Sequence, residues 1–224
     1  MTRGPRTVAV MQPYLYPYAG YFRLLAQADA FVILDDVQFP RRGRVHRCQV
    51  PGPDGSGEEW LTLPLEQQER EVQIRSLRFA SGAQDAFRQR LDRLPWIAGG
   101  VGPLAGRVRQ HLYGPLQDVL DFLEQGLRLV ADELELGASI TRSSALGLDP
   151  ALRGQERIIA IASAHGAGEY LNSPGGRELY VPEAFEAAGM RLRFLDDYKG
   201  RHAHLLPALL GDDLQALRAD LARG

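Results

Sequence analysis

The chain has 224 residues, of which 45% are hydrophobic and 24% charged, and this balance excludes a disordered, fibrous or coiled-coil protein. A formal net charge of −2 gives no excess positive field for a nucleic-acid backbone, so we expect no stable nucleic-acid complex. A single cysteine, Cys48, excludes an internal disulfide and a cysteine-based zinc cluster.

The apolar pattern predicts a cytoplasmic protein with no membrane insertion. Val8 to Met11 is too short for a signal-peptide core, and no later run reaches the roughly 20 apolar residues that span a bilayer. We expect one α/β domain over residues 1–224, with a mainly parallel sheet flanked by helices in a nucleotidyltransferase-like or Rossmann-like arrangement.

The first predicted unit is strand–helix–strand. Thr7 to Met11 and Phe31 to Leu34 are short apolar runs typical of buried strands, and Gly20 to Ala28 between them has helical spacing. Ligands bind beyond the carboxyl ends of parallel strands, which is where the loop "QPYLYPYAGY" and Asp35-Asp36 lie.

Residues 44–79 predict a small antiparallel β insert with strands near 45–50, 60–65 and 72–77, and residues 83–133 predict a helical segment. The α/β rhythm then returns. We expect strands at Ser139 to Thr141, Glu169 to Leu171 and Met190 to Leu195, helices at Gln155 to His165 and Pro182 to Ala188, and a last helix from Asp212 to Leu221.

The loop after the first strand carries Gln12, Tyr14, Tyr18 and Tyr21, which we select as ligand-binding residues. Its two prolines and Gly20 restrict the backbone, and aromatic faces suit sugar rings or bases. The same tyrosines can equally pack the loop onto the sheet.

The second strand is followed by Asp35, Asp36 and an arginine-rich stretch. We expect at most one of the two carboxylates to face the pocket, as a base, a metal ligand or an amine clamp, while the other pairs with an arginine or caps a turn. Gln38, Arg42 and Arg47 are candidate substrate contacts, since arginine holds phosphate or carboxylate bidentately, although a solvated turn uses the same residues.

Ser143, Ser144 and the segment Asn172 to Arg177 also follow predicted strands. We expect Ser143, Ser144, Ser173 and the backbone of Gly175 and Gly176 to contact substrate, or else to cap helices and form an ordinary turn. No histidine spacing indicates a metal site, and His202-Ala-His204 is typical of a surface pair. Cys48 near His46 is a minor candidate nucleophile, because a small buried thiol is the commoner role.

The stretches "MQPYLYPYAGYF", "FVILDDVQF", "RRGRVHR", "WLTLP", "SSALGL" and "QERIIAIASAHGAGEYLNSPGG" together resemble the WbqC-like family over nearly the whole chain. The resemblance implies a role in bacterial surface-polysaccharide (O-antigen) or secondary-metabolite assembly, with amino sugars or other amines as intermediates. The matched positions are Gln12, Pro13, Tyr14, Pro17, Gly20, Tyr21, Asp35, Asp36, Gln38, Arg42, Gly43, Arg47, Glu156, Arg157, Gly175 and Gly176.

The chain departs from the family where relatives tend to have a Trp-x-Asn-Arg-Asn run. It reads Arg44-Val45-His46-Arg47-Cys48 instead, which slightly raises the case for His46 and Cys48 as catalytic residues. The opening is also similar in order to pantothenate synthetase and related nucleotidyl-transferring enzymes, but their histidine pair is absent. We therefore expect no cofactor, while ATP or a divalent metal stays an option.

The function expected from these features is an amide-forming acyl or aminoacyl transferase. Asp36, with Asp35 and His46 as further catalytic candidates, would act on the amine of a sugar nucleotide or similar metabolite. The donor would be a carrier protein, an aminoacyl-tRNA or another activated acyl compound. Two alternatives are a non-catalytic sugar-nucleotide or carrier-binding protein and an ATP-dependent ligase. We expect four segments to converge on one cleft: the Gln12 to Tyr21 loop, Asp35-Asp36, Ser143-Ser144 and Asn172 to Arg177.

Overall fold

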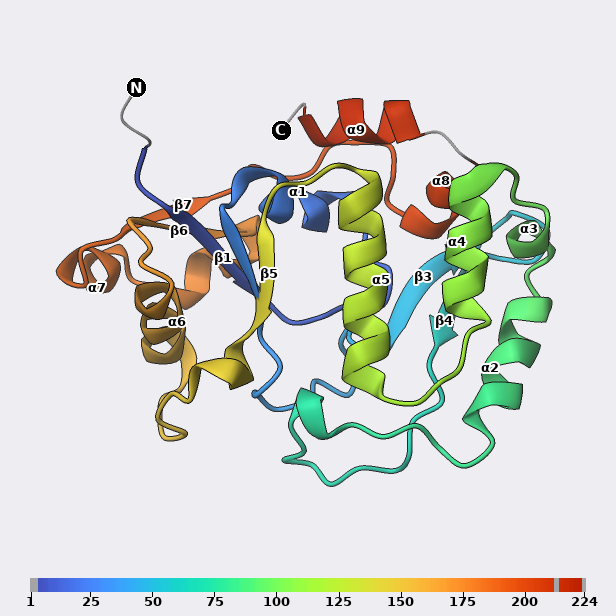
Figure 1. Ribbon diagram of the computed structural model, residues 1–224, viewed down its shortest axis with the longest axis horizontal. Coiled ribbons are helices and arrows are strands. Elements are labelled where there is room, and N and C mark those ends of the chain that lie inside the picture. Colours follow the sequence, from blue (N-terminus) through green and yellow to red (C-terminus); the bar gives the residue numbers. More distant parts are fainter. Residues whose placement is uncertain (1–3, 212–213, 223–224) are drawn as a thin grey trace.

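The computed structural model describes residues 4–211 and 214–222 and has a five-stranded, wholly parallel sheet at its centre (Figure 1). The strands are β1 (Thr7–Met11), β2 (Ala30–Ile33), β5 (Ser139–Arg142), β6 (Glu169–Asn172) and β7 (Arg191–Phe194). A separate antiparallel pair consists of β3 (Arg47–Pro51) and β4 (Glu58–Thr62). The predicted α/β class, with its parallel sheet and small antiparallel part, is confirmed.

Helices surround both sheets. They are α1 (Ala19–Gln27), α2 (Ala83–Asp92), α3 (Pro95–Ala98), α4 (Gly102–Leu112), α5 (Val119–Glu133), α6 (Gly154–Ala164), α7 (Pro182–Ala187), α8 (Leu205–Leu210) and α9 (Leu214–Ala222), with 3-10 turns η1 (Ile74–Ser76), η2 (Ser143–Leu146) and η3 (Pro174–Leu179). The predicted start of the last helix, Asp212, lies outside the described residues. No helix within the described ranges combines the length and apolarity needed to cross a membrane.

The central strands are buried on both faces, which explains their nearly continuous apolar sequences. Val8 and Val10 of β1 belong to a core with α6 and α7, whereas Ala9 faces a larger core that includes α1 and α5. The helices on the two sides of the sheet follow this division (Figure 1).

The strand order β5-β2-β1-β6-β7 determines where a ligand fits. The chain builds outward from β1 to β2 and β5, then returns to place β6 on the other side of β1. Because the winding direction reverses between β1 and β6, the loops after these two strands separate and leave a crevice at the carboxyl edge of the sheet.

The antiparallel insert is smaller than the sequence predicts. The run at 72–77 is not a strand, because Ile74–Ser76 forms a 3-10 turn and buries Ile74 in the core. The segment runs instead beside the stretch after β2, where Ile74 donates to the Val37 carbonyl at 3.0 Å and Arg75 to the Asp35 carbonyl at 2.8 Å. The alternating apolar residues of this segment are therefore buried on one side of the chain, although the segment is not a strand of a sheet.

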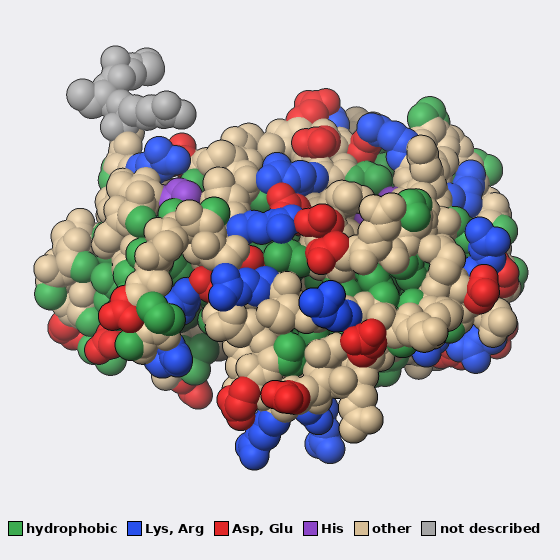
Figure 2. All heavy atoms as spheres, turned by 60° about the horizontal axis from the view of Figure 1, so that its bottom comes forward, with side chains coloured by type: hydrophobic (Ala, Val, Ile, Leu, Met, Phe, Trp, Pro, Cys, Tyr) green, Lys and Arg blue, Asp and Glu red, His purple; other side chains and the backbone are tan. Residues whose placement is uncertain are grey.

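The surface charges are mixed. On the face drawn in Figure 2, lysine and arginine side chains alternate with acidic ones, and no continuous basic stripe forms on the described part of that face. This distribution matches the small formal charge of −2.

Candidate functional site

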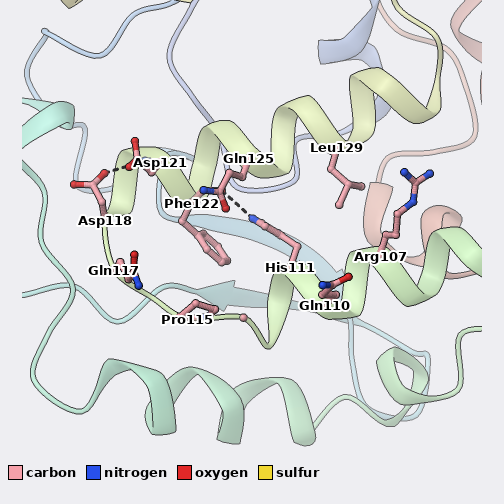
Figure 3. A pocket seen from close by; sticks show the side chains of 11 residues that line it. Arg107, Gln110, His111, Pro115, Gln117, Asp118, Asp121, Phe122, Gln125 and Leu129 are labelled. Atoms are coloured by element: carbon pink, nitrogen blue, oxygen red, sulfur yellow. Dashed lines mark hydrogen bonds between the residues drawn. The ribbon is translucent and has the colours of Figure 1, made fainter.

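A cavity of about 490 Å³ lies between α4 and α5, but its charged residues already have partners (Figure 3). The His111 ring lies 2.8 Å from the Tyr16 hydroxyl and 2.9 Å from the Phe122 carbonyl, so both ring nitrogens are occupied. Asp118 caps α5 by accepting from the Asp121 amide at 2.9 Å. These residues therefore serve the packing of α4 and α5.

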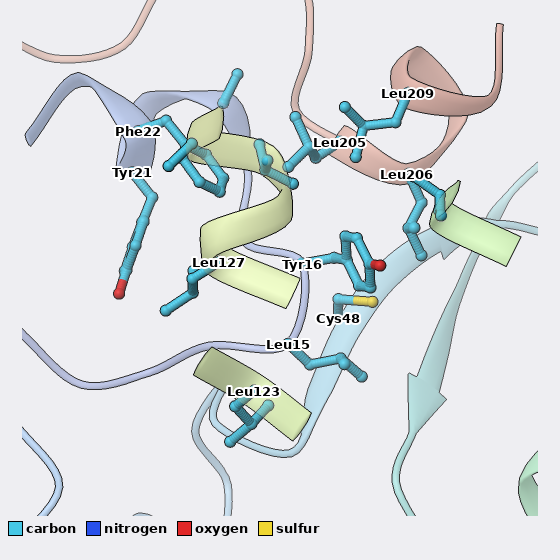
Figure 4. Close-up of a cluster of buried hydrophobic side chains, with 14 of the residues drawn as sticks. Leu15, Tyr16, Tyr21, Phe22, Cys48, Leu123, Leu127, Leu205, Leu206 and Leu209 are labelled. Atoms are coloured by element: carbon cyan, nitrogen blue, oxygen red, sulfur yellow. The ribbon is translucent and has the colours of Figure 1, made fainter. Parts of the chain in front are cut away.

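The loop between β1 and α1 divides its tyrosines between two directions. Tyr16 points into the core beside Leu15 and Cys48 (Figure 4), where its hydroxyl meets His111. Its backbone has a φ of 38°, a left-handed conformation that is unfavourable for a tyrosine and is held here by full burial of the side chain. Tyr14 and Tyr18, two residues away on either side, line a cavity on the opposite side of the loop.

Several contacts hold this loop in place. The Leu15 amide donates to the Val45 carbonyl at 3.1 Å, and the Tyr21 hydroxyl donates to the Gln12 carbonyl at 2.8 Å. Gly20 has no side chain because a Cβ there would collide with the Tyr18 ring and lie 2.8 Å from the Tyr198 Cβ. The rings of Tyr18 and Tyr198 can therefore pack edge to face, with centroids 5.7 Å apart.

The cavity at the β1–β6 reversal has a volume of about 580 Å³, within the range of small-molecule sites. We call it the switch-point cavity. Its lining consists of Met11, Tyr14, Tyr18, Tyr21, Leu24, Arg44, Gln49, Glu58, Ser173, Pro174, Gly175, Asp197, Tyr198, Ala203 and His204. The loops after β1 and β6 thus meet in one cavity, whereas Asp35-Asp36 and Ser143-Ser144, the other two segments of the predicted cleft, do not line it.

A hydrogen-bonded chain of polar groups forms part of the lining. Arg44 Nη2 donates to Gln49 Oε1 at 2.9 Å, and Gln49 Nε2 donates to Glu58 Oε2 at 3.1 Å. Glu58 Oε1 lies 3.0 Å from His204 Nε2, while His204 Nδ1 lies 3.2 Å from the Gln49 carbonyl. Because a carbonyl only accepts, Nδ1 carries a proton, and the remaining contact requires a proton between Nε2 and Glu58.

The phenols of the cavity remain protonated near neutral pH. Burial raises the pKa of Tyr14 and of Tyr18, and the positive charge of Arg44 offsets only part of each increase. Burial also raises the pKa of Tyr21 well above its usual value. Tyr14 and Tyr18 therefore present hydroxyl donors and ring faces, but no phenolate.

The predicted catalytic carboxylates lie outside the switch-point cavity, in a closed cluster at the ends of β2 and β5. Asp35 is fully buried and accepts from the Ser144 amide at 2.9 Å and from the Ser144 hydroxyl at 2.5 Å. The Ser143 hydroxyl lies 2.9 Å from Asp35 Oδ1 and 2.7 Å from Asp36 Oδ1, so it donates to one of them at a time.

The second carboxylate of the cluster, Asp36, forms an ion pair with Arg157 of α6, and the two side chains are only 9% and 8% exposed. Ser143 and Arg157 thus occupy one oxygen each. We call Asp35, Asp36, Ser143, Ser144 and Arg157 the acidic cluster. Its closed hydrogen bonding fits the alternative in which these residues pair with an arginine and cap a turn, and the base role of Asp36 stays a prediction.

The other predicted arginine and glutamine contacts also lie outside the cavity lining. Arg47 donates to the Gly43 carbonyl at 3.0 Å and stacks on Trp60, with its guanidinium carbon 4.2 Å from the ring centroid. Gln38 donates to the Arg70 carbonyl at 2.8 Å, and Arg42 is exposed. Gln12 has its carbonyl bonded to Tyr21.

His46 and Cys48 have the surroundings of packed side chains. Burial, and then the charge of Arg47, lowers the pKa of His46 to about 4, and its ring packs against Phe39. Burial raises the pKa of the Cys48 thiol to about 12, which removes the thiolate that a nucleophile needs. The structure thus places Cys48 in the core (Figure 4), the role that the sequence favours.

The loop after β6 supplies another wall of the switch-point cavity, from residues far in sequence from the tyrosines. Ser173 and Gly175 line the cavity, whereas Gly176 lies behind it, where a Cβ would collide with the Asn172 amide. The Gly176 amide donates to the Ser173 carbonyl at 3.1 Å, which leaves Gly175 as the exposed glycine of the pair.

Sequence reasoning missed six polar residues of the cavity: Arg44, Gln49, Glu58, Asp197, Tyr198 and His204. His204 was expected in a surface pair, and this is corrected by its contacts with Glu58 and Gln49. The signal available was the alternation of Cys48, Gln49 and Val50 in β3, which places the polar Gln49 on the face opposite a buried one.

Comparison with known proteins identifies one family and one similar protein. The model of the WbqC-like protein family matches residues 12–203. An uncharacterized protein of Mycobacterium tuberculosis is similar to the chain, with 27% identity over 225 aligned residues that cover 91% of this chain and 90% of that protein. No solved structure is significantly similar.

Proposed function

The chain belongs to the WbqC-like protein family, and we propose that it is an enzyme that forms an amide by transferring an acyl or aminoacyl group onto an amine. The acceptor would be an amino-sugar nucleotide or a related ring metabolite of bacterial polysaccharide or secondary-metabolite assembly. The observation that supports this most is the Glu58–His204 pair in a cavity that also presents the Tyr14 and Tyr18 rings.

The tyrosines suit a ring-shaped acceptor. Their loop is bonded to the Val45 and His202 carbonyls at 3.1 and 3.2 Å, so little conformational entropy is lost when a ligand packs against it. The protonated hydroxyls of Tyr14 and Tyr18 can donate to sugar oxygens, while the ring faces cover apolar C–H groups.

The carboxylate–imidazole pair suits the activation of an amine. An amine reacts only as the neutral base, so a proton must leave its nitrogen as attack begins. In the proposed step the amine nitrogen bonds to the acyl carbonyl carbon, its proton passes to Glu58, and the bond from that carbon to the donor sulfur or oxygen breaks. The proton then goes to the leaving group, with His204 holding Glu58 in position.

The donor would be a thioester, an ester or an adenylate, delivered by a carrier protein, an aminoacyl-tRNA or a small molecule. The assignment of the base to Asp36 competes with Glu58. Both oxygens of each carboxylate have partners, Ser143 and Arg157 for Asp36 and Gln49 and His204 for Glu58. The two differ in exposure: the Asp36 side chain is only 9% exposed, so the acidic cluster would need to open for it to reach the amine, whereas the Glu58 side chain is 56% exposed.

A mass-spectrometric screen tests the proposal. Sugar nucleotides and amines are combined with acyl donors, and each pair is searched for the mass of an amide product. With an accepted pair, Glu58→Gln is expected to lower kcat by about 100-fold with little change in acceptor affinity.

Asp36→Asn is the matched variant for the competing assignment. This variant is expected to lower the free energy of unfolding, because the buried ion pair with Arg157 is lost, while kcat of the folded fraction changes little. Full turnover in Glu58→Gln would contradict the role of Glu58. Tight acceptor binding with no product from any donor would instead favour a non-catalytic binding protein, the alternative that uses the same aromatic cavity.

A further inference from the structure

A second cavity, of about 560 Å³, adjoins the switch-point cavity, and Asp197 and Tyr198 line both. It lies beside the start of the segment after β7. Its remaining lining residues are Arg23, Arg177, Asp196, Lys199, Gly200, Arg201 and Asp220. We call it the Arg23 cavity.

Arg23 is the unusual member of this set, because its charge is buried without a matching anion. Its side chain comes from α1 and the residue is only 2% exposed. Nη1 donates to the Asp196 carbonyl at 2.9 Å. Within residues 4–211 and 214–222, Nε and Nη2 are buried and have no hydrogen-bond partner. A buried cation with unmatched donors is costly, so such a group calls for an acceptor that binds there.

The nearby charged groups show which acceptor fits. Three more cations, Arg177, Lys199 and Arg201, line the same cavity. Of the carboxylates there, Asp220 accepts from the Tyr198 hydroxyl and from the Arg201 amide, and it does not accept from Arg23 Nε or Nη2. Asp196 and Asp197 are exposed and weaken the attraction for an anion without pairing with the buried guanidinium.

Arg23 is also electrostatically close to the aromatic pair of the switch-point cavity. Burial raises the pKa of Tyr18, and the charges of Arg44 and Arg23 partly offset that increase. Arg23 opposes the rise in the pKa of Tyr198 as well, where burial and Asp220 have the larger effects. Because Tyr198 lines both cavities and its ring packs against Tyr18, an anion bound at Arg23 would lie next to a ring that occupies the switch-point cavity.

We propose that the Arg23 cavity binds the phosphate of a phosphorylated substrate whose ring occupies the switch-point cavity. A guanidinium with two open donors matches two phosphate oxygens, and the flanking cations add charge. A sugar phosphate and a nucleoside diphosphate share this chemistry. The placement of the ring rests on the proposed function, whereas phosphate binding at Arg23 does not.

The experiment measures binding without turnover. Thermal unfolding and calorimetry are recorded with inorganic pyrophosphate, UDP and glucosamine 1-phosphate, in EDTA to exclude metal-bridged binding. At saturating ligand the wild-type Tm is expected to rise by about 4 °C or more. The two organic ligands distinguish the substrate classes. A larger Tm shift with UDP indicates a nucleotide substrate, and a larger shift with glucosamine 1-phosphate indicates a sugar phosphate.

Arg23→Met removes the charge at similar volume. It is expected to abolish the phosphate-dependent shift while leaving the Tm without ligand equal to or above that of the wild type, since an unpaired buried charge is lost. A purely structural Arg23 would give the reverse: a lower Tm without ligand and an unchanged shift. That result, or the absence of any shift in the wild type, would overturn the proposal.

Two exposed arginines provide a second test if Arg23→Met does not fold. Arg177→Ala in the cavity is expected to weaken pyrophosphate binding at least fivefold, whereas Arg88→Ala on α2 removes the same charge elsewhere and should change it less than twofold. Equal effects of the two variants would contradict a specific site. Amide formation can fail in the screen above while this binding persists, so the two proposals stand or fall separately.

Discussion

The carboxyl edge of the sheet holds two polar regions that differ in how their hydrogen bonds are used. In the acidic cluster, at the ends of β2 and β5, serine hydroxyls, a backbone amide and Arg157 meet the carboxylates directly. In the switch-point cavity, at the ends of β1 and β6, the Tyr14 and Tyr18 phenols face open space, and Glu58 remains half exposed.

The difference shows that a strand-end position gathers polar side chains but does not make them available to a ligand. β2 and β5 are adjacent strands with no reversal between them, so the loops after them close over each other. The winding reverses between β1 and β6, so their loops diverge. Strand order therefore decides which region is closed and which is open.

The largest effect is expected from breaking the closed region. Arg157→Met leaves Asp36 buried without its ion pair, and we expect the free energy of unfolding to fall by about 3 kcal/mol. Urea unfolding measures it, with Arg88→Met as an exposed control expected to change stability by less than about 0.5 kcal/mol. The double variant Asp36→Ala/Arg157→Met should recover part of the loss. A loss below about 1 kcal/mol in Arg157→Met would mean that the pair is not closed in solution.

A smaller loss is expected from Gly20→Ala, which crowds the open region. The added Cβ collides with Tyr18 and Tyr198, and overpacking costs about 1–3 kcal/mol, of which about 1 kcal/mol is returned by the better helix propensity of alanine. Gly106→Ala in α4 is the matched control, because its Cβ would meet no atom within 4 Å and should stabilise the helix. Thermal unfolding is expected to show a lower Tm for Gly20→Ala and a higher Tm for Gly106→Ala. A higher Tm in both variants would show that the Tyr18 and Tyr198 rings move aside at little cost.

The pH dependence of His46 tests whether this residue belongs with the closed, packed groups. Its pKa of about 4 lies below the unfolded value near 6.5, so the folded state resists protonation. The stability that depends on neutral His46 is complete above pH 6.5 and is lost as the pH falls toward 4.

His46→Phe keeps the ring contact with Phe39 and removes the titration. Its free energy of unfolding should decline less between pH 6.5 and 4, by about 1 kcal/mol after allowance for partial exposure. The lowered pKa values of His111 and His165 affect both proteins alike and cancel in the difference. Parallel stability curves for the two proteins would place His46 in solvent.

The sequence predicts the sheet strands well because each is a short apolar run bounded by polar or turn residues. Val8 to Met11 and Phe31 to Ile33 are examples, and their direction follows from the helix between them. The run at 72–77 instead alternates apolar and polar residues, and it pairs with the stretch after β2 only through an isolated bridge between Gln38 and Gln73. The spacing of apolar residues indicates which side of a segment is buried. It does not indicate which neighbouring segment forms hydrogen bonds with its backbone.

The candidate site is only partly visible in the sequence. The Tyr14–Tyr18 loop and Ser173 were predicted because each follows a strand directly. Glu58 comes from the antiparallel pair and His204 from the segment before α8, so they reach the cavity through tertiary packing that no local pattern encodes. Gln12, by contrast, follows β1 directly, but its carbonyl is bonded to Tyr21 and it does not line the cavity.

The strand order also has a consequence for how the protein is synthesised. A chain that has emerged from the ribosome only as far as β5 can pair β1, β2 and β5, but it lacks β6 and the residues near 198–204 that complete the cavity. Tyr14 and His204 are joined only by contacts of very high sequence separation, which form slowly because a long loop must close first. The switch-point cavity is therefore expected to form last, when β6 and the residues near 198–204 pack against the Tyr14–Tyr18 loop.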